Sequence, residues 1–330
     1  MTTPPDKIAA LELICPAGNP AALEAAVAAG ADVVYAGFAD ATNARNFPGL
    51  NFTRDEMAAG IDHAHRHGCG VYIAVNTYPE AGNAGPWRRA VEDAATLGAD
   101  AIILADIGLL QYAAETRPDL RRHLSVQASA SNRAAIEFYQ RAFGVKRVVL
   151  PRVLTLAEIA ELNQSLPVET EVFAFGGMCV MAEGRCTLSA YATGQSPNCN
   201  GVCSPASHVR YERRGGDTVS RLGDFTLNIF SEGEAAGYPT LCKGRFVAGD
   251  SASYLFDEPS SLNVLEMLPE LAAAGVRALK IEGRQRGRAY VSRVVSAFRQ
   301  AVDGSAQSGA LDDMTEGARN TAGAYQKSWH

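Results

Sequence analysis

Five of the seven cysteines lie between residues 178 and 277, which is less than a third of the 330-residue chain. Four of them, Cys179, Cys186, Cys203 and Cys242, are separated by 6, 16 and 38 residues. Thiolates are soft ligands that bind zinc or iron–sulfur clusters, and four thiolates complete the ligand set of either. The spacing contains no CxxC pair, which zinc knuckles commonly use, so it favours a cluster over zinc. The alternative is four buried free thiols, because cysteine packs readily inside proteins.

The neighbours of these four cysteines favour metal ligands over core packing. Each cysteine lies near glycine, proline or a cation, and Arg185, Lys243 and Arg245 could offset the negative charge of a cluster. Cys199 lies four positions before Cys203 and is interpreted as a spare thiol, although it could exchange as a ligand. The remaining two cysteines are interpreted as small apolar core residues: Cys15 and Cys69.

The composition predicts a globular protein. Hydrophobic residues make up 47% of the chain and charged residues 20%, so there is enough apolar surface for a packed core. Thirty basic and 36 acidic residues give a net charge of −6, which argues against binding of nucleic acid through a broad positive field. The sequence shows no export signal, and no run approaches the roughly 18 apolar residues of a membrane span. With an odd number of cysteines, these features predict a cytoplasmic protein without disulfides or a transmembrane segment.

Short apolar runs alternate with alanine-rich segments of helical period up to about residue 177, a pattern typical of parallel strands joined by helices. Seven strands are predicted in this region: Leu11–Gly18, Asp32–Gly37, Gly70–Thr77, Ala101–Asp106, Leu124–Ser129, Arg147–Arg152 and Glu171–Gly177. Four helices are predicted between them: Pro20–Ala29, Arg54–His67, Pro86–Leu97 and Leu156–Gln164.

An eighth strand is predicted at Ala278–Gly283, followed by a helix at Ala289–Val302. Eight parallel strands favour an α/β fold of the TIM-type (β/α)8 barrel class, because closure removes both edges of the sheet. The roughly 100 residues at 178–277 are then an insertion between strands 7 and 8 that carries the cysteines and ends in a predicted helix, Leu262–Ala274. The insertion starts at the barrel face that carries active sites in this fold.

Polar side chains at the strand ends and in the loop after the second strand are candidates for binding substrate. They are Asn43, Arg45, Asn76, Asp106, Gln127, Ser129, Arg152 and Glu282. The alternative for each residue is a hydrogen-bonded barrel lining or a helix cap. Arg45 and Arg152 could hold a substrate carboxylate through paired N–H donors, which would suit a dicarboxylate that donates oxygen.

Residues Glu171–Ser189, EVFAFGGMCVMAEGRCTLS, resemble the signature of the U32 peptidase family, with Gly177 where that signature has serine or alanine. The resemblance extends over nearly the whole chain and includes ELICPAGN, TNARNFPGLNFT, SVQASASN, YPTLCKGRF and KIEGRQR. It is strongest to the members of this collagenase-like family that act in ubiquinone biosynthesis. It implies that residues 1–330 form one U32-type barrel domain with the insertion at about 178–277.

The resemblance also implies a cofactor and a partner. Members of this branch carry a [4Fe-4S] cluster on four cysteines, which correspond to Cys179, Cys186, Cys203 and Cys242. They act as a heterodimer with a UbiV-like homologous subunit in oxygen-independent hydroxylation of the ring of a ubiquinone precursor, with prephenate as the proposed oxygen donor. The resemblance therefore implies a subunit of a ring hydroxylase under anaerobic conditions.

Three alternatives remain from the sequence. A U32-type peptidase would need a nucleophile with its base or an HExxH helix, and neither pattern occurs in the sequence. An RNA-hydroxylating U32 relative would need a basic groove, against which the net charge of −6 argues unless the basic residues form a local patch. A protein that only carries a cluster and stabilises its partner would show no activity when isolated.

Overall fold

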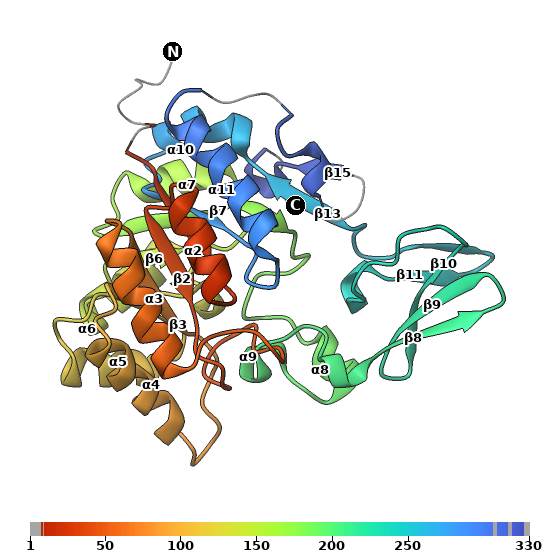
Figure 1. Ribbon diagram of the computed structural model, residues 1–330, viewed down its shortest axis with the longest axis horizontal. Helices are drawn as coiled ribbons and strands as arrows, with labels where there is room; N and C mark the ends of the chain where they lie inside the picture. The colour runs from red at the N-terminus through yellow and green to blue at the C-terminus, as the bar shows by residue number, and fades with distance from the viewer. Residues whose placement is uncertain (1–7, 9, 306–308, 316–318, 327–330) are drawn as a thin grey trace.

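The computed structural model describes residues 8, 10–305, 309–315 and 319–326, and its centre is a closed parallel barrel (Figure 1). Each strand pairs with the next, and β14 closes the barrel by pairing in parallel with both β7 and β1. The barrel strands are β1 (Glu12–Pro16), β2 (Val33–Ala36), β3 (Gly70–Val75), β4 (Ala101–Leu104), β5 (Arg122–Leu124), β6 (Arg147–Val149), β7 (Glu169–Gly177) and β14 (Ala278–Ile281). The predicted TIM-type (β/α)8 fold is confirmed.

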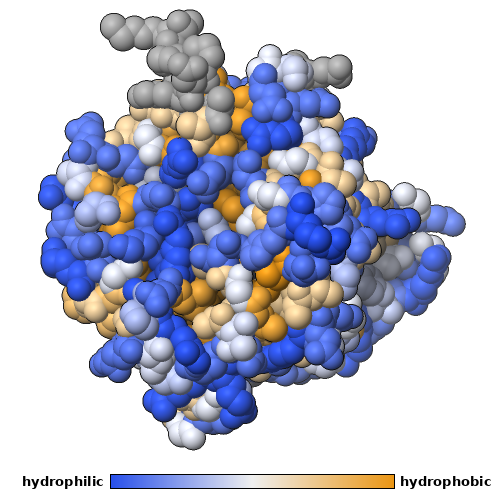
Figure 2. All heavy atoms as spheres, turned by 60° about the vertical axis from the view of Figure 1, so that its left-hand side comes forward, coloured by the Kyte–Doolittle hydropathy of each residue, from blue (hydrophilic) through white to orange (hydrophobic). Residues whose placement is uncertain are grey.

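Helices follow the strands and cover the outside of the barrel. They are α2 (Pro20–Ala28), α3 (Arg54–Arg66), α4 (Gly85–Thr96), α5 (Ile107–Thr116), α6 (Arg133–Phe143), α7 (Leu156–Asn163) and α11 (Arg288–Val302). Local sequence fixes several of their starts: Thr53 forms a capping box with Glu56, and Thr155 forms one with Glu158. Figure 2 shows one outer face, on which hydrophilic residues predominate and apolar residues appear between them. Across the described ranges, we find no helix with the length and apolarity needed to traverse a lipid bilayer.

Residues 178–277 leave the barrel after β7 and return at β14, as the predicted insertion requires. A three-stranded antiparallel sheet, β8 to β10, and a two-stranded hairpin, β11 and β12, extend to one side of the barrel (Figure 1). The elements of the insertion are α8 (Leu188–Thr193), α9 (Pro197–Asn200), β8 (Val209–Arg214), β9 (Asp217–Leu222), β10 (Phe225–Phe230), β11 (Arg245–Ala248), β12 (Ser251–Tyr254), β13 (Ser260–Asn263) and α10 (Leu268–Ala273).

Two predicted elements were wrong in part. The predicted helix Leu262–Ala274 begins instead as β13, and only its second half is α10. The long strand β7 offers an edge beyond the barrel, and β13 pairs with it in antiparallel fashion, so tertiary pairing overrides the local pattern. The predicted strand Leu124–Ser129 ends at Leu124, because Ser125 accepts a hydrogen bond from the backbone N–H of Gln127 and starts a short 3-10 turn.

The described part of the C-terminal segment packs on the barrel. The strand β15 (Arg319–Thr321) pairs in parallel with β13. The hydroxyl of Tyr325 donates a hydrogen bond of 2.9 Å to the backbone carbonyl of Phe173 in β7. The described part of the segment after Asp303 therefore packs against β13 and β7.

The inside of the barrel near its amino end holds buried charges. Lys280 Nζ donates to Glu171 Oε1 at 2.6 Å and lies 3.8 Å from the ring centroid of Tyr35. Arg147, which is 1% exposed, donates to Glu12 at 2.7 Å and to Glu169 at 2.6 Å. Buried charges are tolerated only when they are paired, so these contacts are a condition of the fold.

We expect Lys280→Met to lower the free energy of unfolding by about 3–5 kcal/mol, because it leaves the fully buried carboxylate of Glu171 without its ammonium partner. The double variant Lys280→Met/Glu171→Leu removes both charges and should recover most of that loss. Urea denaturation of the single and double variants measures both values. If the double variant is no more stable than the single one, the pair is not the source of the loss.

Candidate functional site at the carboxyl end of the barrel

The four cysteines predicted as ligands lie on separate segments of the insertion. Cys179 lies two residues after β7, Cys186 two residues before α8, Cys203 three residues after α9, and Cys242 in the short 3-10 helix Leu241–Lys243. All four are partly buried, whereas Cys199 on α9 is exposed. The other two cysteines are buried in the core, as predicted: Cys15 and Cys69.

The four thiols influence one another electrostatically. Burial raises the pKa of Cys179, and the neighbouring Cys203 raises it further. Burial also raises the pKa of Cys203 and of Cys242, and Cys186 contributes to both increases. Such effects arise between nearby groups, so Cys203 lies near each of the other three thiols.

The described residues contain no group of three or more His, Cys, Asp or Glu side chains arranged to hold a metal ion. Cysteine thiolates are soft donors, which zinc and iron–sulfur clusters both accept, so the residue types present suit either group.

Two arginines and two glutamates form a chain of ion pairs beside the cysteines. Arg45 Nη2 lies 2.9 Å from Glu282 Oε1, and Arg152 Nη2 lies 2.6 Å from Glu282 Oε2. The second nitrogen of Arg152 donates to Glu183, which lies between Cys179 and Cys186 in the sequence. The barrel strand ends are thereby joined to the first cysteine segment. We refer to Arg45, Glu282, Arg152 and Glu183 as the ion-pair chain.

The ion-pair chain is buried at Arg152 and Glu183 and partly exposed at Arg45 and Glu282, whose side chains are 27% and 23% exposed. Arg152 is 4% exposed and its guanidinium lies 3.5 Å from the ring centroid of Phe173. Burial acts to raise the pKa of Glu282, but Arg152 and Arg45 lower it to about 2. The same two arginines lower the pKa of Cys203 against the effect of burial. The positive charges that face the thiols therefore come mainly from the barrel.

This arrangement corrects the expectation for the cations next to the cysteines in sequence. Arg245 pairs with Glu234 at 3.0 Å and donates to Asn228, so its charge is neutralised within the insertion. Arg185 is exposed. Of the three cations, Lys243 acts to lower the pKa of Cys242, but burial outweighs it and the pKa is raised. The arginines that lower the pKa of the thiols are Arg45 and Arg152. They come from the barrel and are distant in sequence from the cysteines.

Close backbone contacts seat the cysteine segments against the barrel loops. A Cβ atom at Gly184 would lie 1.9 Å from the carbonyl oxygen of Gln127, so no side chain fits there. Gly201 has φ 77°, and a Cβ atom on it would lie 2.8 Å from Cα of Ala44. The backbone N–H of Arg45 donates to the carbonyl of Gly201 at 2.8 Å. Glycine at these two positions allows the segments to approach.

The other predicted substrate residues have structural partners. Asn76 accepts a hydrogen bond from the backbone N–H of Ala44 at 2.9 Å, and Asp106 accepts one from Leu109 as the N-cap of α5. Asn43 accepts one from Arg284 at 2.8 Å. These three residues support the loops, so their role in substrate binding stays a prediction.

Gln127 differs, because its side-chain oxygen is buried and has no hydrogen-bond partner among the described residues. Ser129 has φ 52° and donates its hydroxyl hydrogen bond to the backbone carbonyl of Glu183. The sequence analysis missed Glu183, Phe173 and Arg284 in this site. Phe173 and Glu183 lie within the segment Glu171–Ser189 that carries the family resemblance, and Arg284 lies within KIEGRQR.

The guanidinium groups of Arg45 and Arg152 share a carboxylate, but it belongs to Glu282 of the same chain. The predicted role of these arginines in holding a dicarboxylate therefore requires the substrate to compete with Glu282. The expectation that prephenate binds there stays a prediction.

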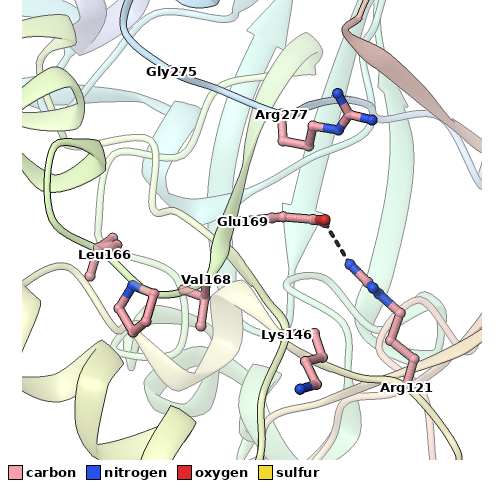
Figure 3. Close-up of a pocket in the computed structure, with 8 residues that line it drawn as sticks. Arg121, Lys146, Leu166, Val168, Glu169, Gly275 and Arg277 are labelled. Carbon is pink, nitrogen blue, oxygen red and sulfur yellow. Dashed lines mark hydrogen bonds and ion pairs between the residues drawn. The ribbon is translucent and has the colours of Figure 1, made fainter.

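A separate cavity of about 570 Å³ lies at the opposite end of the barrel (Figure 3). It is lined by Arg121, Lys146, Leu166, Pro167, Val168, Glu169, Gly275 and Arg277. These residues lie at the amino ends of β5, β6, β7 and β14, and Arg121 pairs with Glu169 at 2.6 Å. Active sites of this fold lie at the carboxyl ends, so the cavity is not part of the cysteine site.

The sequence profile of peptidase family U32 matches residues 18–327. The chain belongs to this family. The tRNA hydroxylation protein P of Haemophilus influenzae is 32% identical over 325 residues, which cover 92% of this chain and 69% of that protein. An uncharacterized protease of Methanocaldococcus jannaschii is 30% identical and matches 97% of this chain and 72% of its own length.

A more distant relative is the 23S rRNA 5-hydroxycytidine synthase of Escherichia coli, which is 29% identical over 89% of this chain and 39% of its own length. Among solved structures, a U32 peptidase aligns with a TM-score of 0.43 at 16% identity, covering 51% of this chain and 70% of the other. The names of these relatives therefore include both hydroxylation and proteolysis.

We expect Glu282→Gln to be about 3 kcal/mol less stable than the wild type at neutral pH, because lowering of the pKa from 4.5 to about 2 stabilises the folded state. The lowered pKa contributes stability above pH 4.5 that is lost as the pH falls towards 2, so the difference between variant and wild type should shrink over that range. Urea denaturation at several pH values measures it. Glu161→Gln, on the exposed side of α7, is the control, and a difference that stays constant down to pH 3 contradicts the prediction.

Proposed function

We propose that this chain is a hydroxylation protein of the U32 family that acts on RNA and binds a [4Fe-4S] cluster through Cys179, Cys186, Cys203 and Cys242. The observation that carries the proposal is the match over 92% of the chain to a protein named for tRNA hydroxylation. A relative named for synthesis of a hydroxylated rRNA nucleoside supports the same reaction class. The cysteine site supports the cofactor.

The residues of the site would serve such a cofactor in distinct ways. The four thiols would bind the cluster, and Arg45 and Arg152 would place positive charge beside it. When bound, a cluster of this kind supplies one-electron redox chemistry. The ion-pair chain would hold the first cysteine segment on the barrel through Glu183.

The site does not favour peptide hydrolysis by a cysteine nucleophile. Burial raises the pKa of Cys179, Cys203 and Cys242, and a raised pKa disfavours the thiolate that would attack a peptide bond. Arg152 acts to lower the pKa of Cys179, and Arg45 and Arg152 act to lower that of Cys203, but burial outweighs them. The peptidase alternative therefore has little support from this site.

A second candidate substrate is the ring of a ubiquinone precursor, with the chain acting beside a UbiV-like subunit and prephenate as oxygen donor. Two observations favour it: the sequence resemblance to the ubiquinone-biosynthesis branch of the family, and a net charge of −6, which does not favour RNA. Both candidates share a hydroxylation reaction and the cysteine site. They differ in the molecule that must reach the barrel mouth.

Deletion of the gene under anaerobic growth separates the two candidates. The proposal predicts loss of a hydroxylated nucleoside from total RNA, read by mass spectrometry of nucleosides, and its return on complementation with the wild type. Complementation with Cys203→Ala should fail, and complementation with Cys199→Ala should succeed. Unchanged nucleosides together with a missing quinone would instead assign the chain to the second candidate.

Anaerobic purification should give about four irons and four sulfides per chain, because four thiolates complete the ligand set of one cluster. Replacement of any of the four cysteines by alanine should remove most of the iron and the visible absorption. Cys199→Ala is the matched control and should keep both, because Cys199 is exposed and lies outside the proposed ligand set. Zinc in place of iron, or full iron content in two or more of the four variants, would contradict the proposed cofactor.

A further inference from the structure

Exposed apolar side chains are concentrated on the insertion. Ten large hydrophobic residues are exposed in the described part of the chain, and eight of them lie within residues 178–277. The eight are Tyr191, Tyr211, Phe225, Ile229, Tyr238, Val247, Leu255 and Phe256. Concentrated exposed apolar groups mark binding surfaces. The insertion therefore presents a contact surface in addition to the cysteines.

Two of these residues form an exposed aromatic pair. Tyr191 on α8 is 80% exposed and Phe225 at the start of β10 is 37% exposed. Their ring centroids lie 5.8 Å apart with an interplanar angle of 45°. Core burial does not explain Tyr191, because four-fifths of its surface is open to solvent. Its ring is held in place by Phe225 and presents a flat surface.

Arginines lie at the turn that precedes Phe225. Arg210 and Arg221 occupy paired positions on β8 and β9, and both side chains reach back to the turn between β9 and β10. Arg210 Nη2 donates to the carbonyl of Gly223 at 2.9 Å, and Arg221 Nη2 donates to that of Asp224 at 2.8 Å. The turn itself packs on α8, because a Cβ atom on Gly223 would lie 2.6 Å from the carbonyl oxygen of Ala192.

The charge at this surface is not neutralised within the chain. Arg210 is held only by a carbonyl oxygen, and the exposed Arg213 on the same strand has no ion-pair or side-chain hydrogen-bond partner among the described residues. Arg221, in contrast, lies 3.8 Å from Glu212. The guanidinium of Arg210 is therefore available to an anionic ligand at the turn beside Phe225, although the chain as a whole carries a charge of −6. Arg213 faces Thr218 near the other end of β8 and lies apart from this turn.

Flat exposed rings next to free cations are what single-stranded nucleic acid requires. Unpaired bases stack on aromatic side chains whatever their sequence, and arginines neutralise the phosphates. A protein partner would also bury the rings, but it would have to supply acidic groups for the arginines. RNA supplies rings and phosphates in one ligand, and the relatives with hydroxylation names act on RNA by those names.

We propose that Tyr191 and Phe225 form a stacking platform for unpaired bases of an RNA, with Arg210 neutralising a phosphate beside it. This inference rests on the proposed function, and it adds that the RNA is bound as a single strand through the insertion. The platform lies close to the cysteine site, because α8 starts two residues after Cys186 and contacts the 3-10 helix that carries Cys242.

The test measures binding of an unmodified tRNA transcript and of a short single-stranded RNA to the anaerobically purified full chain by fluorescence anisotropy. Tyr191→Ala and Phe225→Ala should each weaken binding about 5- to 150-fold, the range for loss of one stacked base. Tyr191→Phe keeps the ring and should bind as the wild type does. Phe138→Ala, which removes an exposed ring on α6, is the matched control and should change nothing.

Arg210→Ala should lower the slope of log affinity against log salt by about 0.7, the value for one phosphate contact with a single strand. Arg133→Ala, which removes an exposed arginine that pairs with Glu137 on α6, should leave the slope unchanged. Iron content of every variant shows whether the insertion remains folded. The platform is refuted if alanine at both rings leaves RNA binding intact in variants that keep their iron.

The result also separates this inference from the proposed function. If the Tyr191→Ala strain still makes the hydroxylated nucleoside at the wild-type level and its protein binds RNA normally, the platform is wrong and the RNA function stands. If deletion of the gene leaves all nucleosides unchanged and the wild type binds no RNA, both are wrong. If alanine at Tyr191 removes a co-purifying protein but not RNA binding, the rings serve a protein partner and the platform is overturned.

Discussion

The carboxylate of Glu282 is shared by Arg45 and Arg152, and the rest of the site depends on this interaction. It joins the loop after β2, the end of β6 and the end of β14, which are distant in sequence. Because Arg152 also holds Glu183, the same interaction reaches the first cysteine segment. The buried Arg152 and the partly exposed Arg45 share this carboxylate, so each charge of the group has an opposite partner.

The barrel and the insertion contribute different parts of the site. The barrel supplies rigid strand ends and the charges on them, and the insertion supplies the thiols. At Gly184 and Gly201 the backbone of the insertion lies directly against the barrel loops, with no side chain between them. The outer part of the insertion, β8 to β12, carries five of the eight exposed large hydrophobic residues of the insertion, so it presents apolar surface to other molecules.

The sequence predicted the barrel well because its signals are local. Alternation of apolar runs and helical segments located all eight strands, and the excess length before the eighth located the insertion. The prediction failed where pairing decides the structure: Leu262 lies in a strand because β7 extends beyond the barrel. It identified Arg45, Arg152 and Glu282 as strand-end candidates but not the ion pairs between them, since the partners of Arg152 are 31 and 130 residues away in sequence. Such contacts follow from the closed barrel and not from neighbouring residues.

The position of β14 between β7 and β1 has a consequence for the order in which the molecule assembles. During synthesis the first seven strands emerge as an open sheet, and the segment that seals it emerges only after the whole insertion has been made. Until then, both edges of the sheet are unpaired and prone to non-native association. Sealing also joins residues far apart along the chain, which slows folding. Capture of metal by the insertion before the last strand arrives would therefore shorten the effective loop and speed closure.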